Sequence, residues 1–336
     1  MRWVQYIWLS FLLGVLVACS NPSNQKKTPA HFVPQNANQV LKIKQWQTTL
    51  NDFNEHPVMK QLAEESFSNL FTLHQPLFNA LDFNNEVLFA SEKKGDSSTV
   101  FTLISEGTEG IQLIDSLLQE KGKEIPFEQW TLQQFPFEDQ SYYQVISDSI
   151  RILSNSEKNL QEVLRSEKKQ DSTFQKAFKV KQPESLVYVS KLAQDPSSLA
   201  AATAFELKLM ADGMAANGVV LDTDATSQWI TLFKGQIPQP IESQHIIPNS
   251  AQKATIITLS DIASFENRLQ IFRKDSLLTL PSYFETATEI VEIRDNNQRT
   301  FAVKSLDVDL AQESLLAMIT EKEAFREVPI LSLIHI

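Results

Sequence analysis

The sequence predicts an α+β protein made of tandem units of mainly antiparallel sheet with packed helices, in which the second unit is incomplete. Two observations support this prediction. Short apolar runs of strand length alternate with longer amphipathic stretches along the chain. A seven-residue pattern that begins at His31 recurs at His245, and the predicted elements that follow it have the same order in both places.

The first eighteen residues resemble a secretory signal peptide. Arg2 supplies a positive charge, and an apolar run extends from Trp3 to Ala18. A membrane-spanning helix needs about 20 apolar residues, so this run favours a cleaved signal over an uncleaved anchor. It ends in Leu16-Val17-Ala18-Cys19, which resembles the lipobox of bacterial lipoproteins. Because the chain has one cysteine, at this position, we predict lipidation at Cys19 rather than an accidental cysteine beside an ordinary signal.

The segment after the cysteine predicts a flexible tether over residues 19–30, because residues 20–30 contain no large apolar side chain. An acidic cluster marks transport to the cell surface in some Bacteroidota lipoproteins, and none follows Cys19. We therefore expect a lipid anchor in the outer membrane, with the protein facing the periplasm.

Composition limits the classes of partner. The net charge of −11 and the pI near 5.0 argue against nucleic-acid binding, which selects basic surfaces. The hydrophobic content of 42%, with 21 phenylalanines, is sufficient for a sizeable core. A chain with one cysteine forms no internal disulfide.

We assign residues 31–244 to the first α+β unit. Its first part predicts a strand, an amphipathic helix, a pair of strands joined by a polar turn at residues 91–98, and a further helix. These are the strand Val40–Lys44, the helix presenting Trp46, Leu50 and Phe53 on one face, the strands Glu86–Ala90 and Val100–Ile104, and the helix containing Ser116-Leu117-Leu118.

The remainder of this unit predicts an antiparallel meander, a helix that begins near Ser154-Asn155-Ser156, and further strands. The predicted strands are Trp130–Phe135, Tyr142–Ile146, Ile150–Leu153, Leu186–Ser190, Phe205–Met210, Val219–Leu221 and Trp229–Phe233. Asp212-Gly213 and Asn217-Gly218 are typical turn sequences.

We assign residues 245–330 to a partial second unit. It predicts the strands Thr255–Leu259, Glu289–Ile293 and Phe301–Lys304, and a helix containing Ser314-Leu315-Leu316. Because no counterpart of the meander follows, we expect Leu315, Leu316 and Ile319 to be more exposed than Leu117 and Leu118. Residues 331–336 resemble the translation of a sequencing-adapter read-through, and we expect a non-native tail there rather than a final strand.

Both units open with a Pro-x-[Asn/Ser]-Ala sequence, at Pro34–Ala37 and at Pro248–Ala251, and Leu232–Gln236 precedes the second opening. In these features residues 16–330 resemble a family of uncharacterised Bacteroidota envelope lipoproteins with repeated α+β units. The resemblance implies a fold and an anchor, but no activity.

The histidines do not form a pattern of metal ligands. His31, His56, His74 and His245 are separated in sequence, with no His-x-His or His-Glu-x-x-His motif. His31 and His245 occupy equivalent positions, which indicates a local hydrogen bond at the start of each unit. We predict no metal site and no cofactor.

Two acidic motifs have structural alternatives. Asp222-Thr-Asp224-Ala-Thr226 resembles the start of a calcium loop, but the chain lacks the glycine and the glutamate that such a loop needs, so a polar hairpin loop is favoured. Asp307 and Asp309 would lie on one face of a strand as an acid–base pair, but Asp309 as a helix N-cap is the simpler interpretation. Gly107 and Gly110 indicate a turn rather than a nucleotide-binding loop.

These observations predict a non-catalytic binding or scaffolding module with a partner in the cell envelope. A cluster of aromatic residues would line a partner groove or form part of the core, and the strand spacing favours the core. These residues are Trp130, Phe135, Phe137, Tyr142 and Tyr143. Two alternatives stay open: a larger envelope hydrolase whose catalytic region is missing, and a periplasmic carrier of a hydrophobic ligand.

Overall fold

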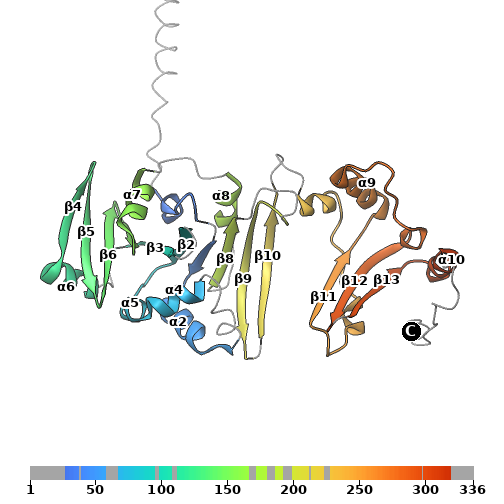
Figure 1. The fold of residues 1–336 in the computed structure, drawn as a ribbon, viewed down its shortest axis with the longest axis horizontal. Helices are drawn as coiled ribbons and strands as arrows, with labels where there is room; N and C mark the ends of the chain where they lie inside the picture. Colours follow the sequence, from blue (N-terminus) through green and yellow to red (C-terminus); the bar gives the residue numbers. More distant parts are fainter. Residues whose placement is uncertain are drawn as a thin grey trace, which may run out of the picture. The chain divides into compact units, whose positions relative to one another are not determined.

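The computed structural model describes residues 27–37, 39–57, 67–94, 98–107, 112–165, 172–179, 186–191, 199–211, 213–222, 228–296 and 298–318. They belong to two compact units (Figure 1). The first unit holds a ten-stranded antiparallel sheet and the second a three-stranded antiparallel sheet, so the predicted α+β class is confirmed. The predicted signal peptide, Cys19 and the tail at residues 331–336 lie outside the described residues.

The first part of unit 1 follows the predicted order of elements. They are η1 (Pro29–Phe32), β1 (Gln39–Ile43), α2 (Trp46–Glu55), α4 (Phe67–Leu73), α5 (Gln75–Ala80), β2 (Val87–Lys94), β3 (Ser98–Glu106) and α6 (Gln112–Lys121). The second part contains β4 (Lys123–Phe127), β5 (Trp130–Phe137), β6 (Gln140–Ser147), β7 (Ile150–Ser154), α7 (Glu157–Arg165), α8 (Ser172–Lys179), β8 (Leu186–Lys191), β9 (Ala202–Met210) and β10 (Gly213–Leu221). The strand order in the sheet is β10-β9-β8-β1-β2-β3-β7-β6-β5-β4.

The central strands of this sheet are buried on both faces. In β1, Leu41 and Ile43 belong to the main hydrophobic core, whereas Val40 points to the opposite face and is equally buried. Helix α7 packs on β3, β6 and β7, and α8 packs on β8 and β9. Covering both faces in this way requires strands that are apolar at nearly every position, as in Val87–Ala90.

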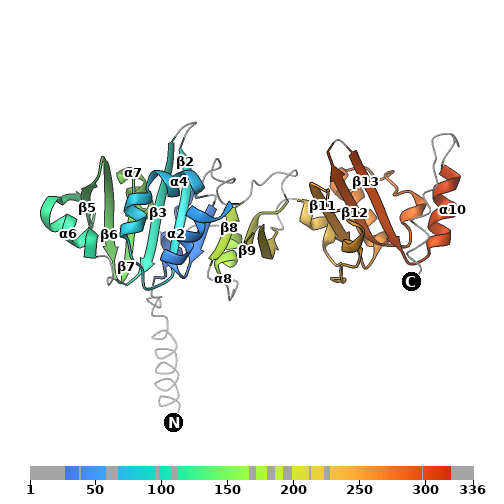
Figure 2. The same cartoon turned by 90° about the horizontal axis from the view of Figure 1, so that it is seen from below.

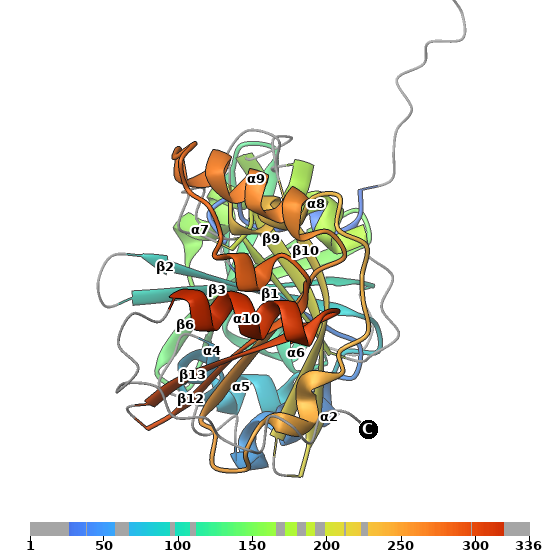
Figure 3. The same ribbon diagram turned by 90° about the vertical axis from the view of Figure 1, so that its right-hand side faces the viewer.

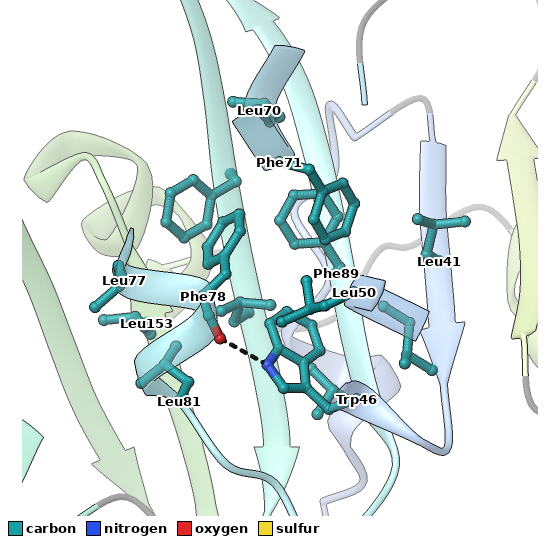
Figure 4. Close-up of a cluster of buried hydrophobic side chains, with 14 of the residues drawn as sticks. Leu41, Trp46, Leu50, Leu70, Phe71, Leu77, Phe78, Leu81, Phe89 and Leu153 are labelled. Atoms are coloured by element: carbon teal, nitrogen blue, oxygen red, sulfur yellow. Dashed lines mark hydrogen bonds between the residues drawn. The ribbon is translucent and has the colours of Figure 1, made fainter. Parts of the chain in front are cut away.

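Aromatic side chains fill the core under α2, α4 and α5 (Figure 4). Trp46 lies at its centre, with its ring edge-on to Phe78 and Phe83 at centroid distances of 5.8 and 5.0 Å. Its indole Nε1 donates a hydrogen bond of 3.0 Å to the carbonyl oxygen of Phe78. This bond lets a large aromatic ring be buried without leaving its one polar group unsatisfied.

The predicted meander is confirmed as β5, β6 and β7, preceded by β4. Three two-residue turns join these four strands. The first residue of each turn has a positive φ, 53° at Glu128, 50° at Glu138 and 57° at Asp148. Glutamate seldom takes this conformation, so residue type alone did not indicate where these turns lie.

Two predicted local structures are wrong. Asn217-Gly218 is not a turn but lies inside β10, because the backbone of β9 passes so close that a Cβ on Gly218 would lie 2.0 Å from the carbonyl oxygen of Ala204. Trp229–Phe233 is not a strand but the 3-10 helix η3, whose Leu232 is fully buried.

The second unit contains η3 (Trp229–Phe233), η4 (Ser243–Ile246), β11 (Lys253–Thr258), α9 (Ile262–Arg273), η5 (Ser282–Phe284), β12 (Ala287–Asp295), β13 (Gln298–Ser305) and α10 (Val308–Met318). Leu232, Leu259 and Phe265 form its buried core, and α10 packs on η5 and β13 (Figure 3). Because Leu232 packs with α9, residues 228–244 belong with this unit rather than with the first, to which we had assigned them.

In the opening of each unit, the histidine ring bonds to the backbone of the residue three positions earlier. In the first, the Nδ1 of His31 accepts the backbone N–H of Thr28 at 3.0 Å. In the second, the Nδ1 of His245 lies 2.7 Å from the carbonyl oxygen of Glu242, so the position is the same but the backbone group differs. The backbone N–H of the alanine that closes the motif bonds to the carbonyl of the proline at 3.0 Å in both copies.

Strand pairing extends the equivalence through both sheets. Val40 pairs with Ala90, which pairs with Thr102. Ala254 pairs with Ile293, which pairs with Thr300. Thr102 and Thr300 are therefore equivalent and lie 198 positions apart, as do the Ser-Leu-Leu sequences of α6 and α10. This agreement confirms the predicted repeat of element order, with β13 the counterpart of β3 and α10 the counterpart of α6.

Candidate functional site

The predicted lipidation site, Cys19, lies outside the described residues, so lipidation stays a prediction. Within the described part of the chain, no helix is both long enough and apolar enough to span a membrane. The same residues contain no cluster of three or more histidine, cysteine or acidic side chains arranged to hold a metal ion.

The histidines that we considered as metal ligands lie apart and bond to protein groups. His31 and His245 bond locally, and the Nε2 of His56 contacts the carbonyl oxygen of Met210. His74 alone is buried, between α4 and α5 and next to Phe101, with 4.9 Å between the ring centroids.

His74 belongs to a buried polar cluster with Tyr142 and Asn155. Its Nδ1 lies 2.9 Å from the Tyr142 hydroxyl, and its Nε2 lies 3.4 Å from the Asn155 Nδ2. The Asn155 Oδ1 accepts the backbone N–H of Phe101 at 2.9 Å, which turns the amide nitrogen toward the histidine. Nε2 is therefore the acceptor, and the ring proton is on Nδ1, which donates to Tyr142.

Burial disfavours charge on both rings of this cluster. It lowers the pKa of His74 to about 4. Burial, followed by the negative charge of Glu138, raises the pKa of Tyr142 to about 12. Both groups are neutral at pH 7, so the cluster joins β6, β7 and the α4–α5 segment through uncharged hydrogen bonds.

A second buried cluster surrounds Arg151 on β7, which is 3% exposed. Its Nη1 donates to the Asp115 Oδ1 at 3.2 Å and to the Gln144 Oε1 at 3.0 Å. Gln144 in turn donates to Gln133 at 2.8 Å. The cluster links α6 to three strands of the meander, so its charge is used to position a helix on the sheet.

Glu289 of β12 is the buried acid of the second unit. Its two oxygens accept the backbone N–H groups of Glu242 and Ser243, each at 3.0 Å, at the start of η4. Burial alone would raise the pKa of Glu289, but the hydrogen bonds from Ser243 and Glu242 and the charge of Lys304 together lower it. The carboxylate is therefore ionised at neutral pH and holds η4 on the sheet.

Replacing Glu289 by alanine is expected to destabilise the second unit by about 1–3 kcal/mol, because two buried N–H groups lose their acceptor. Glu289→Gln keeps one acceptor oxygen and should lose less. Urea unfolding followed by circular dichroism measures both losses. The change Glu285→Gln, at an exposed position of the same unit, is the control, and equal stability of Glu289→Ala and wild type would contradict the assignment.

The two acidic motifs have the following positions. The loop that begins at Asp222 continues outside the described residues. Helix α10 begins at Val308, and the Asp307 Oδ1 accepts the N–H of Leu310 at 2.9 Å. Asp307 is therefore the capping residue, and the assignment of this role to Asp309 is wrong, because the helix begins two residues earlier than we predicted.

Of the aromatic residues singled out in the sequence, Phe135 and Tyr142 belong to the buried core and Phe137 packs against it. Trp130 and Tyr143 are half-buried. The prediction from strand spacing, that these aromatic residues belong to the core, is therefore confirmed for Phe135 and Tyr142.

Several large apolar side chains of β13, of α10 and of the turn between them are exposed. They are Phe301, Leu306, Val308, Leu310, Leu315 and Leu316. Leu315 and Leu316 are 39% and 46% exposed, whereas the equivalent Leu117 and Leu118 pack against the core of unit 1. The predicted difference in exposure is confirmed for these two pairs, and Ile319 lies outside the described residues.

No protein-family model matches the chain, and no curated protein matches it. Among solved structures, crystal form IV of TP0453 matches with a TM-score of 0.31 and 11% sequence identity, over 57% of this chain and 79% of that one. A TM-score this low does not establish a shared fold.

Proposed function

We propose that the protein is anchored by lipid in the cell envelope and that its α+β units act as a non-catalytic binding or scaffolding module. The observation on which the proposal depends is the placement of Cys19 directly after Leu16-Val17-Ala18 at the end of an apolar run. A diacylated or triacylated cysteine binds a bilayer firmly, whereas one acyl chain binds marginally.

Two features of the folded units support a binding role. The buried polar groups around His74, Arg151 and Glu289 are used to hold elements together. In the second unit, large apolar side chains are exposed beside a strand that lies at the edge of the sheet in the described part of the chain. Exposed apolar side chains beside a strand edge are typical of surfaces that accept another chain.

Replacing Cys19 by alanine is expected to abolish lipid labelling and to release the protein from the membrane fraction, because the thiol is the acylated group. Metabolic labelling with an alkyne fatty acid, followed by fractionation, measures both effects. Ser20→Ala changes the neighbouring residue to the same type and should leave labelling unchanged. Labelling of Cys19→Ala at the wild-type level would show that the anchor is elsewhere.

A further inference from the structure

Helix α9 of the second unit has an exposed stripe along its outer side. Ser264, Asn267 and Ile271 are exposed and are spaced by three and four residues, so they lie on one face of the helix. Phe265, on another side, is buried in the core of the unit. Helix α10 packs on η5 and β13 and lies on the β13 side of the sheet, as Figure 2 shows, whereas α9 packs on η3. Ile271 is 65% exposed, which is unusual for a large apolar side chain on a packed helix.

The first unit, in which the chain continues through many further elements, has the same stripe on α2. Aligned from their N-cap residues, Gln45 and Asp261, the two helices place Ile271 at the position of Glu55. All counterparts of the α9 stripe are exposed on α2; they are Thr48, Asn51 and Glu55. The position of Ile271 therefore faces solvent in both units, and the second unit has an apolar side chain where the first has a carboxylate.

The segment after α9 holds a second large apolar side chain in the open. Lys274 ends the helix with a φ of 55°, and the backbone N–H of Asp275 bonds to the carbonyl oxygen of Gln270 at 3.0 Å. The Gln270 side chain donates to the carbonyl oxygen of Leu278 at 2.8 Å, and the Asp275 Oδ1 accepts the N–H of Leu277 at 3.0 Å. These bonds hold the backbone in a defined turn, on which Leu277 is 88% exposed.

The charge around these two apolar side chains is positive. Residues 267–281 contain three basic residues and one acidic residue, Asp275, which gives a formal charge of +2 in a chain whose net charge is −11. Glu266, one residue before this stretch, is half-buried and accepts the backbone N–H of Leu280 at 2.9 Å. The basic residues are Arg268, Arg273 and Lys274. The acidic character of the chain is thus reversed at this end of α9.

We call Ile271, Arg273, Lys274 and Leu277, all exposed, the α9 tip. A stable protein interface involves about 20–30 residues on each side, so four residues are too few for one. Apolar side chains with basic neighbours are typical of segments that lie in the interface of a lipid bilayer. Anionic headgroups attract lysine and arginine, and the apolar side chains leave water. A weak contact of this kind is sufficient in a tethered chain, because the tether keeps the membrane close.

We propose that the α9 tip binds the surface of a phospholipid bilayer that contains anionic headgroups. Arg273 and Lys274 contact the headgroups, and Ile271 and Leu277 enter the boundary between headgroups and acyl chains. The inference rests on the proposed function, since the anchor brings the chain to the membrane, and it names the bilayer as the ligand of the second unit.

A dye at position 277 tests whether the tip enters a bilayer. The chain from residue 19 onward with Cys19→Ala has no thiol and no lipid, so Leu277→Cys supplies one site for an environment-sensitive nitrobenzoxadiazole label. Vesicles with equal amounts of phosphatidylcholine and phosphatidylglycerol should shift its emission to shorter wavelength and increase the intensity. Leu73→Cys on α4, where the leucine is 66% exposed in the first unit, is the matched control and should show no shift.

Sedimentation with the same vesicles tests the charges, in the unlabelled chain with Cys19→Ala. Arg273→Gln combined with Lys274→Gln should weaken binding about 25-fold, or about fivefold for each charge. Lys121→Gln combined with Lys123→Gln makes the same change of net charge at exposed positions of the first unit and should have little effect. Ile271→Glu, which introduces the residue found in α2, should also weaken binding, and circular dichroism checks that each variant is folded.

The proposal is overturned if vesicles do not shift the dye at position 277 or shift the dye at position 73 equally. It is also overturned if the two pairs of glutamine variants bind equally, or if phosphatidylcholine vesicles alone bind the chain as tightly as the mixed vesicles. A dye at position 277 that is already shifted without vesicles would show that protein covers the tip, either the rest of the chain or a second copy, and would overturn it as well.

Failure of this test is distinguishable from failure of the proposed anchor. Vesicle binding is measured on purified protein without lipid, whereas labelling at Cys19 is measured in cells. A protein that is labelled at Cys19 but whose α9 tip stays in water removes the membrane contact alone. A protein that is not labelled but whose tip enters vesicles removes the anchor alone.

Discussion

Lowering the pH from 7 to about 4 is expected to destabilise unit 1 by about 2–3 kcal/mol through His74. The pKa of His74 is lowered from 6.5 to about 4 by burial. As the pH falls below 6.5, the unfolded chain binds a proton at this histidine and the folded chain does not. The contribution of His74 to the stability of unit 1 is therefore fully present above pH 6.5 and is lost progressively as the pH falls to about 4.

The variant His74→Phe isolates this contribution from that of the carboxylates, which titrate in the same range. It should be less stable than wild type at pH 7, because the Tyr142 hydroxyl and the Asn155 amide lose a partner. Between pH 7 and 4.5 its stability should fall by about 2 kcal/mol less than that of wild type. Urea unfolding at both pH values measures the difference, with the exposed His245→Phe as control. Parallel pH profiles for His74→Phe and wild type would contradict the neutral, buried state of His74.

Replacing Trp46 by alanine is expected to cost unit 1 about 3–5 kcal/mol, because it leaves a large cavity among aromatic rings. Trp46 is almost fully buried and contacts Phe71, Phe78 and Phe83. Trp46→Phe keeps most of the apolar volume but removes the hydrogen bond to the Phe78 carbonyl, so a loss of about 1–3 kcal/mol is expected.

Thermal and urea unfolding of the two Trp46 variants test this order of stabilities. Leu73→Ala on α4 is a suitable control, since Leu73 is 66% exposed and its loss should change stability by less than about 0.5 kcal/mol. If Trp46→Ala were as stable as Leu73→Ala, the aromatic cluster would not be the main core of unit 1.

Short-range patterns in the sequence predicted those features that depend on neighbouring residues. The spacing of Trp46, Leu50 and Phe53 predicted an amphipathic helix, and all three are buried on α2. The alternation in Tyr142–Ile146 predicted a strand of the meander. These predictions succeed because helix and strand periods place side chains on a face before any tertiary contact forms.

Turns and caps were less predictable where tertiary contacts override residue preference. Asn217-Gly218 is typical of a turn, but at Gly218 the glycine is required by the close approach of β9. The turns at Glu128 and Glu138 use residues that rarely adopt a positive φ, and strand pairing on both sides stabilises them. A local preference of about 1 kcal/mol is small beside the free energy of pairing whole strands.

The sequence by itself determined the α+β class and the repeat that makes His31 equivalent to His245, and it predicts the signal and the lipobox. Only the tertiary structure decided that β7 follows β3 in the sheet and that Arg151 lies buried between Asp115 and Gln144. The physical reason is that periodicity records which way a side chain points, whereas strand order and burial depend on contacts between residues far apart in the chain.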